Sequence, residues 1–165
     1  MTHHSTYISP RVTTRLLLVL LTLALPSLVF AQTNKQKPMG ADDPIFTEYR
    51  GVQIGWLADE VRKKLGDPAS KGDEQDYYMF GDKESAQFQY DKATKKVVAI
   101  SVDFMNGANA ILTPQQVFGA EIEAKPDGSK WKLIRYPKAG CWVSYSRTAG
   151  DTPIITVTIQ KIPGP

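Results

Sequence analysis

Six short segments with the composition of β-strands constrain the fold of this chain more than any other feature. They come in two groups of three: 76–80, 86–91 and 96–104, then 131–136, 141–146 and 154–160. In most of them apolar and polar residues alternate, which places the apolar side chains on one face of a strand. The turns between neighbouring segments are short, so we expect antiparallel pairing within each group.

A short amphipathic helix is predicted before the first group of strands, within residues 51–68. Apolar residues recur there at three- and four-residue spacing: Trp56 or Leu57, Val61 and Leu65. Gly66 can adopt the left-handed conformation that ends a helix, and Pro68 prevents its continuation. Arg62, Lys63 and Lys64 form its basic end, which we interpret as a solvated helix face.

A second helix start precedes the second group of strands. Thr113 is a suitable N-cap, Pro114 fits the first helical position and Gln116 completes a capping box. Comparable positions in the two halves lie 55 or 56 residues apart. The pattern therefore predicts an α+β fold of two tandem α-β-β-β units, residues 44–106 and 107–165, with antiparallel sheets and short helices packed on one face. An undivided α+β domain with accidental symmetry is the alternative.

The N-terminal 31 residues have the pattern of a secretory signal peptide. Arg11 and Arg15 precede an apolar run over residues 16–30, and small or short residues lead to a cleavage point between Ala31 and Gln32. A membrane-spanning helix needs about 20 apolar residues, more than this proline-interrupted run provides. We expect a cleaved signal, then a flexible polar linker over residues 32–43, and a periplasmic or secreted protein.

The composition of the exported chain excludes several chemistries. Both histidines lie in the predicted signal peptide, which rules out Ser-His-Asp triads, Cys-His pairs and histidine metal ligands after cleavage. Cys141 is the single cysteine, so no intramolecular disulfide can form, and we expect its thiol to be buried and structural. Loss of Arg11 and Arg15 lowers the formal net charge from +3 to +1, which does not favour nucleic-acid binding.

No metal site or cofactor is expected either. The acidic segment 73–76 offers oxygen ligands, but it lacks the glycine and the distal glutamate of a calcium loop.

One stretch resembles a family of small bacterial envelope proteins. Residues 54–61 (IGWLADEV) and 65–68 (LGDP) are similar to the glycine, Glu-Val and Leu-Gly-x-Pro pattern of the SmpA/OmlA family. The resemblance covers 51–104 more closely than 109–160. It implies a tandem arrangement similar to the β-lactamase-inhibitor-protein fold, which presents a sheet surface to a partner protein. No cysteine follows the predicted cleavage point, so we expect no lipid anchor after signal cleavage.

Aromatic side chains are the candidates for a binding surface. Each strand has two faces and only one can meet a helix, and exposed Tyr and Trp are favoured at recognition surfaces. The candidate binding residues are Tyr77, Tyr78, Trp131, Tyr136 and Trp142. Since neighbours alternate, only one of Tyr77 and Tyr78 points away from the core. The alternative is that the second face is covered by the other unit or by a loop.

These observations favour a non-catalytic protein-binding module of the cell envelope, whose partner is another envelope or secreted protein. Two alternatives stay open: a secreted inhibitor or binder of an extracellular enzyme, and a hydrolase that uses carboxylates alone. An open aromatic sheet face favours binding, whereas two carboxylates converging in a cleft favour the hydrolase.

Overall fold

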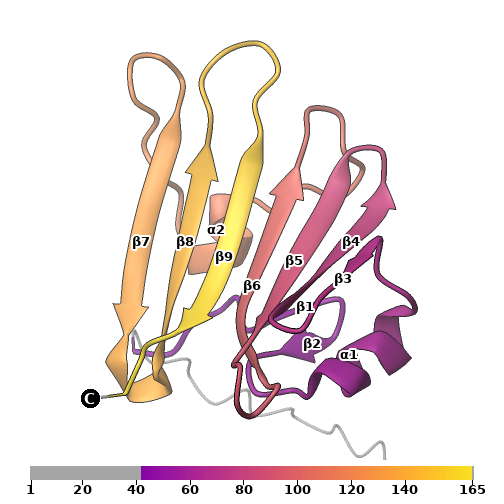
Figure 1. The fold of residues 1–165 in the computed structure, drawn as a ribbon. Helices are drawn as coiled ribbons and strands as arrows, with labels where there is room; N and C mark the ends of the chain where they lie inside the picture. The colour runs from indigo at the N-terminus through magenta and orange to yellow at the C-terminus, as the bar shows by residue number, and fades with distance from the viewer. Residues whose placement is uncertain (1–41, 165) are drawn as a thin grey trace, which may run out of the picture. The chain divides into compact units, whose positions relative to one another are not determined.

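A seven-stranded antiparallel sheet carries most of the structure (Figure 1). This computed structural model describes residues 42–164. The predicted signal peptide, its cleavage point and residues 32–41 of the predicted linker therefore lie outside the described residues. From one edge of the sheet to the other the strands are β3 (Ser70–Lys71), β4 (Gln75–Gly81), β5 (Glu84–Tyr90), β6 (Val97–Phe104), β9 (Ile155–Lys161), β8 (Cys141–Arg147) and β7 (Lys130–Tyr136).

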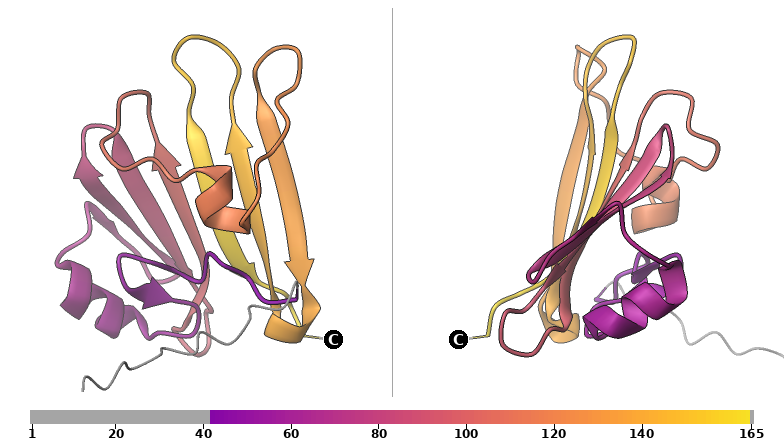
Figure 2. Two further views of the ribbon diagram at one scale, coloured as in Figure 1. Left: turned by 180° about the vertical axis from the view of Figure 1, so that it is seen from behind. Right: turned by 45° about the vertical axis from the view of Figure 1, so that its right-hand side comes forward.

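Two short helices and a small hairpin lie on the same face of this sheet (Figure 2). They are α1 (Ala58–Leu65), α2 (Pro114–Phe118) and the pair β1 (Glu48–Tyr49) and β2 (Val52–Gln53). A turn of 3-10 helix, η1 (Pro137–Ala139), connects β7 to β8. The prediction of an α+β fold with antiparallel strands and few short helices is confirmed. No helix in the range 42–164 has the length and apolar character needed to cross a bilayer.

The predicted helix ends agree with the structure. Thr113 caps α2 and its hydroxyl accepts a hydrogen bond from the Gln116 amide, 3.3 Å away, while Pro114 occupies the first turn. In α1 the Glu60 carboxylate accepts from the Leu57 amide at 2.8 Å, which satisfies one of the donors left free at a helix start. The Leu57 side chain is exposed, so the buried stripe of α1 begins at Ala58 and includes Val61.

The structure differs from the prediction in β6. Alternation places Val98 on the buried face with Ile100, Val102 and Phe104, but Val97 is the buried residue and Val98 is only half-buried. The cause is a bulge, because Gln89 of β5 pairs with Ala99 whereas the next residue, Tyr90, pairs with Val97. An extra residue in one strand reverses the alternation beyond it.

The two groups of strands form one sheet instead of separate sheets. β6 and β9 pair along six residues, with Val102 opposite Val157 at the middle of the ladder. Their helix-facing side chains belong to one continuous hydrophobic core with those of β4, β5 and β8. We call this the inner face of the sheet, and the opposite one the outer face.

Adjacent residues of β5 test this assignment of faces. Phe88 is fully buried on the inner face, and its neighbour Gln89 is exposed on the outer face. We expect Phe88→Ala to lower the free energy of unfolding by about 3–5 kcal/mol, as truncation of a core aromatic does. Gln89→Ala should stay within about 0.5 kcal/mol of the wild type. Urea unfolding of both variants measures the difference, and equal effects would contradict the assignment.

Candidate binding face

The outer face of the sheet is the largest surface that no described helix or hairpin covers (Figure 2). The strand register places its residues in rows that cross the sheet. The rows, read from β4 to β7, are Gln75, Gln89, Ala99, Gln160, Trp142 and Arg135; Tyr77, Gln87, Ser101, Thr158, Ser144 and Leu133; and Met79, Ser85, Asp103, Thr156, Ser146 and Trp131.

The middle of the outer face is polar and almost uncharged. Across the β6–β9 ladder the hydroxyls of Ser101 and Thr158 lie 3.0 Å apart, and Thr156 donates to the Asp103 carboxylate at 2.6 Å. Short hydroxyl side chains leave the backbone of a sheet accessible, and they can exchange water for a partner's hydrogen bonds. The middle of this face is therefore suited to polar contacts rather than to apolar packing.

Apolar side chains gather at the β7–β8 end of the outer face. Trp131 is 62% exposed and Leu133 is 37% exposed, and both project from the edge strand. Trp142 on β8 is half-buried and pairs with Arg135 across the ladder. Tyr77 and Met79 form a smaller apolar group at the other end of the face. Large exposed apolar side chains next to hydrogen-bonding groups are typical of recognition surfaces.

Three of the five candidate binding residues lie on this face, and two do not. Tyr77, Trp131 and Trp142 are on the outer face. Tyr78 and Tyr136 are 3% and 5% exposed and belong to the core on the inner face. Burial raises the pKa of Tyr78 to about 12, and its hydroxyl donates to the Gly66 carbonyl at 3.1 Å. Since the partner of a folded protein reaches only its surface, Tyr78 and Tyr136 are structural residues.

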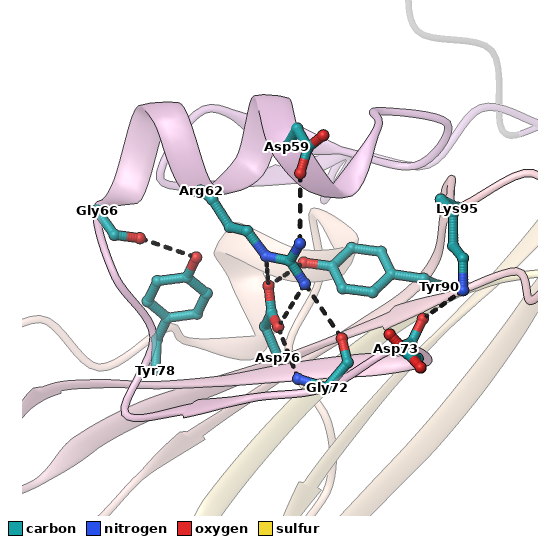
Figure 3. A network of polar contacts seen from close by, with 9 residues as sticks. All are labelled: Asp59, Arg62, Gly66, Gly72, Asp73, Asp76, Tyr78, Tyr90 and Lys95. Carbon is teal, nitrogen blue, oxygen red and sulfur yellow. Dashed lines mark hydrogen bonds and ion pairs between the residues drawn. The ribbon is translucent and has the colours of Figure 1, made fainter.

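A buried carboxylate beneath α1 is the main polar feature of the inner face (Figure 3). Asp76 of β4 has no exposed side-chain surface. Arg62 of α1 donates to both of its oxygens, from Nε at 2.8 Å and from Nη2 at 3.0 Å. The Tyr90 hydroxyl and the Gly72 amide donate to it as well, at 2.8 Å and 3.2 Å. Four donors therefore surround this carboxylate and tie α1 to β4 and β5.

The charge state of Asp76 follows from these contacts. Burial on its own would raise the pKa of the Asp76 carboxyl, but the hydrogen bonds from Arg62, Tyr90 and the Gly72 amide outweigh burial, so the pKa lies below its usual value. The same contact raises the pKa of Tyr90, because burial and the adjacent carboxylate both disfavour its ionised form. At neutral pH the site thus holds a carboxylate, a guanidinium and a neutral phenol.

The sequence patterns gave a different role to both members of this ion pair. Arg62 was expected on a solvated helix face, yet its side chain is mostly buried over β4, while Lys63 and Lys64 are exposed. Asp76 was grouped with the acidic segment that ends β3. The available signal was parity: Asp76 shares its strand face with Tyr78, so an inward Tyr78 implies an inward carboxylate that needs a cation.

Asp76→Asn should destabilise the protein strongly and in a pH-dependent way. Breaking a buried ion pair costs about 3–5 kcal/mol at pH 7. Because the folded-state pKa is depressed, this stabilisation is present above the unfolded value of about 3.9 and is lost as pH falls through the folded pKa. The difference from wild type should therefore shrink between pH 7 and pH 3 in urea unfolding.

Asp59→Asn is the matched control for that experiment. Asp59 also contacts Arg62, at 3.3 Å, but its side chain is almost fully exposed, and an exposed ion pair contributes little. Equal losses in the two variants would contradict a specific role for the buried carboxylate.

Cys141 is buried on the inner face at the start of β8, as expected. Burial raises the pKa of its thiol, which lowers the fraction of reactive thiolate at neutral pH. We expect a thiol reagent to label the native protein at least about a hundredfold more slowly than the urea-unfolded chain, because the strand must open first. Equal labelling rates in the native and unfolded states would contradict a structural role.

The described part of the chain contains no cluster of three or more His, Cys, Asp or Glu side chains that could hold a metal ion. Comparison with known proteins adds no relative: no family model matches the chain, and neither a curated protein nor a solved structure is similar to it.

Proposed function

We propose that this protein is an exported, non-catalytic binding module of the cell envelope, and that it binds another envelope or secreted protein through the outer face. The observation that carries the proposal is the sidedness of the sheet. Both helices and the β1–β2 hairpin lie on the inner face, while Trp131, Leu133 and Trp142 remain accessible on the other (Figure 2).

The chemistry of the outer face favours a partner surface that is apolar and nearly neutral. Its charged residues within the described chain are Asp103 and Arg135, which offset each other. Trp131 and Leu133 offer apolar area, and the hydroxyl rows offer both donors and acceptors. A strongly charged surface would find little electrostatic complement here.

The export part of the proposal depends on the signal-peptide pattern of residues 1–31. N-terminal sequencing of the secreted or periplasmic product is the measurement that addresses it. We expect the product to begin at Gln32 or within a few residues of it. A product that retains the apolar residues 16–25 would contradict export as a soluble protein.

We also propose that the fold consists of two related α-β-β-β units. Two observations support this: α1 precedes β4, β5 and β6 as α2 precedes β7, β8 and β9, and β6 pairs with β9 at the middle of the sheet. Within that ladder Ile100 faces Ile159, and Phe104 faces Ile155. A shift of 55 residues exchanges these two pairs, as expected for two copies related by a twofold rotation.

The hydrolase alternative gains no support from the inner-face carboxylate. Asp76 accepts hydrogen bonds at both oxygens and lies beneath Arg62, so it offers no free oxygen to a substrate. An inhibitor or binder of an extracellular enzyme would use the same outer face, and the identity of the captured partner distinguishes it from an envelope module.

Removal of the outer-face tryptophans should abolish partner binding without unfolding the protein. The purified protein is crosslinked to an envelope extract, and the recovered partner is then titrated against the wild type and the double variant Trp131→Ser, Trp142→Ser. We expect at least a tenfold loss of affinity, corresponding to about 2 kcal/mol for a hot-spot tryptophan.

Lys63→Ser with Lys64→Ser is the matched control, because both lysines are exposed on α1, away from the outer face. It should bind as the wild type does. Unchanged binding of the tryptophan variant, with its urea midpoint also unchanged, would contradict the proposal.

A further inference from the structure

The free edge of β7 is the most unusual feature of the sheet. It is seven residues long, its register with β8 has no bulge, and it contains no proline or glycine. At the other edge β3 has two residues, and a register shift interrupts β4 near Gly81. Short, bulged edges resist strand addition, whereas a long regular edge invites it.

No segment among the described residues lies along the outside of β7 (Figures 1 and 2). Within residues 42–164, the ladder with β8 supplies the hydrogen bonds of the β7 backbone, and no turn or loop adds another. Alternate amide and carbonyl groups of an edge strand point away from its neighbour, so they are free to pair with an added strand.

The lysines of β7 do not protect this edge. Edge lysines usually discourage pairing by extending into the space where a new strand would lie. Here the Lys130 ammonium is 3.7 Å from the Glu121 carboxylate, and the Lys132 ammonium lies 5.2 Å from the centre of the Phe118 ring. Both are thus engaged by their own chain on the inner face.

We propose that two copies of this chain pair through β7, antiparallel and centred on Leu133, which would join the two sheets into one of fourteen strands. This register uses all seven residues of the strand. It places Trp131 of each copy opposite Arg135 of the other, Lys130 opposite Tyr136, and Leu133 opposite its own equivalent. A guanidinium beside an indole forms a cation–π pair, and cross-strand pairs of this kind stabilise antiparallel ladders.

Neighbouring registers that keep both outer faces on one side are worse. Centring on Lys132 would place two ammonium groups opposite each other, and centring on Ile134 would pair only five of the seven strand residues. Arg135 supports the same choice, because it is exposed and makes no ion pair within residues 42–164. Residues 32–41 are a poorer occupant, since they add only cations (Lys35 and Lys37) to a basic strand and contain Pro38 and Gly40.

The proposed pairing does not depend on the partner-binding function, and the two can fail separately. It would place Trp131, Leu133 and Trp142 of both copies at the middle of a single outer face. Dimerisation is measured on the purified protein alone, whereas the proposed function is measured by capture of a different protein.

Site-specific crosslinking tests the register. Under mild oxidation Leu133→Cys should form a disulfide-linked dimer, because residues paired across an antiparallel ladder lie within disulfide range. Trp131→Cys alone should not crosslink, but an equilibrated mixture with Arg135→Cys should give the heterodimer. Met79→Cys is the matched control: it is 60% exposed on the outer face of β4, far from the β7 edge, and should remain monomeric.

The oligomeric state provides a readout that needs no cysteine variant. Light scattering after gel filtration should give twice the chain mass for the wild type. Leu133→Lys, which places two like charges opposite each other, should weaken the dimer at least tenfold while the urea midpoint of the monomer stays unchanged. A wild type that remains monomeric at high micromolar concentration would overturn the proposal. Leu133→Cys that crosslinks no faster than Met79→Cys would overturn the register.

Discussion

The ladder between β6 and β9 is the interaction on which the rest of the structure depends. Three strands with one apolar face do not bury enough surface to be stable alone, and the chain contains two such groups. Pairing of Val102 with Val157, and of the residues on either side, joins them into one sheet with one core. The helices, the accessible face and both edges of the sheet are consequences of that pairing.

Because the two groups of strands meet edge to edge, neither covers the face of the other. Both short helices lie on the inner face, and the outer face has no other described element to cover it (Figure 2). The Arg62–Asp76 pair reinforces this arrangement. A buried carboxylate is tolerated only where donors surround it, so α1 is held over β4 by the cation that Asp76 requires.

The outer face and the edge of β7 meet at the same side chains. Trp131, Leu133 and Arg135 project from the outer face and also line the free edge, so a strand added there would extend the face. A polar middle between apolar ends fits contact with a folded partner, whose surface contributes both hydrogen bonds and apolar area. The bias towards binding thus comes from side chains that the core does not use.

Local sequence determined the strands, their alternation and the helix caps. Periodicity identified the buried residues of β5, β8 and β9, and Thr113 and Gly66 marked helix ends, because these signals depend on neighbours within a few residues. It also established the lack of histidine in the exported chain and a lone, inward Cys141. Residues 42–43, the described end of the predicted linker, are exposed.

Only the tertiary structure decided which of Tyr77 and Tyr78 faces outward, that Tyr136 is buried, and that Arg62 reaches Asp76 from another element. It also decided that Val97 replaces Val98 in the core, since a bulge depends on the register of the partner strand. Alternation specifies two faces but not which one is covered. That choice is made by long-range packing between segments that no local pattern connects.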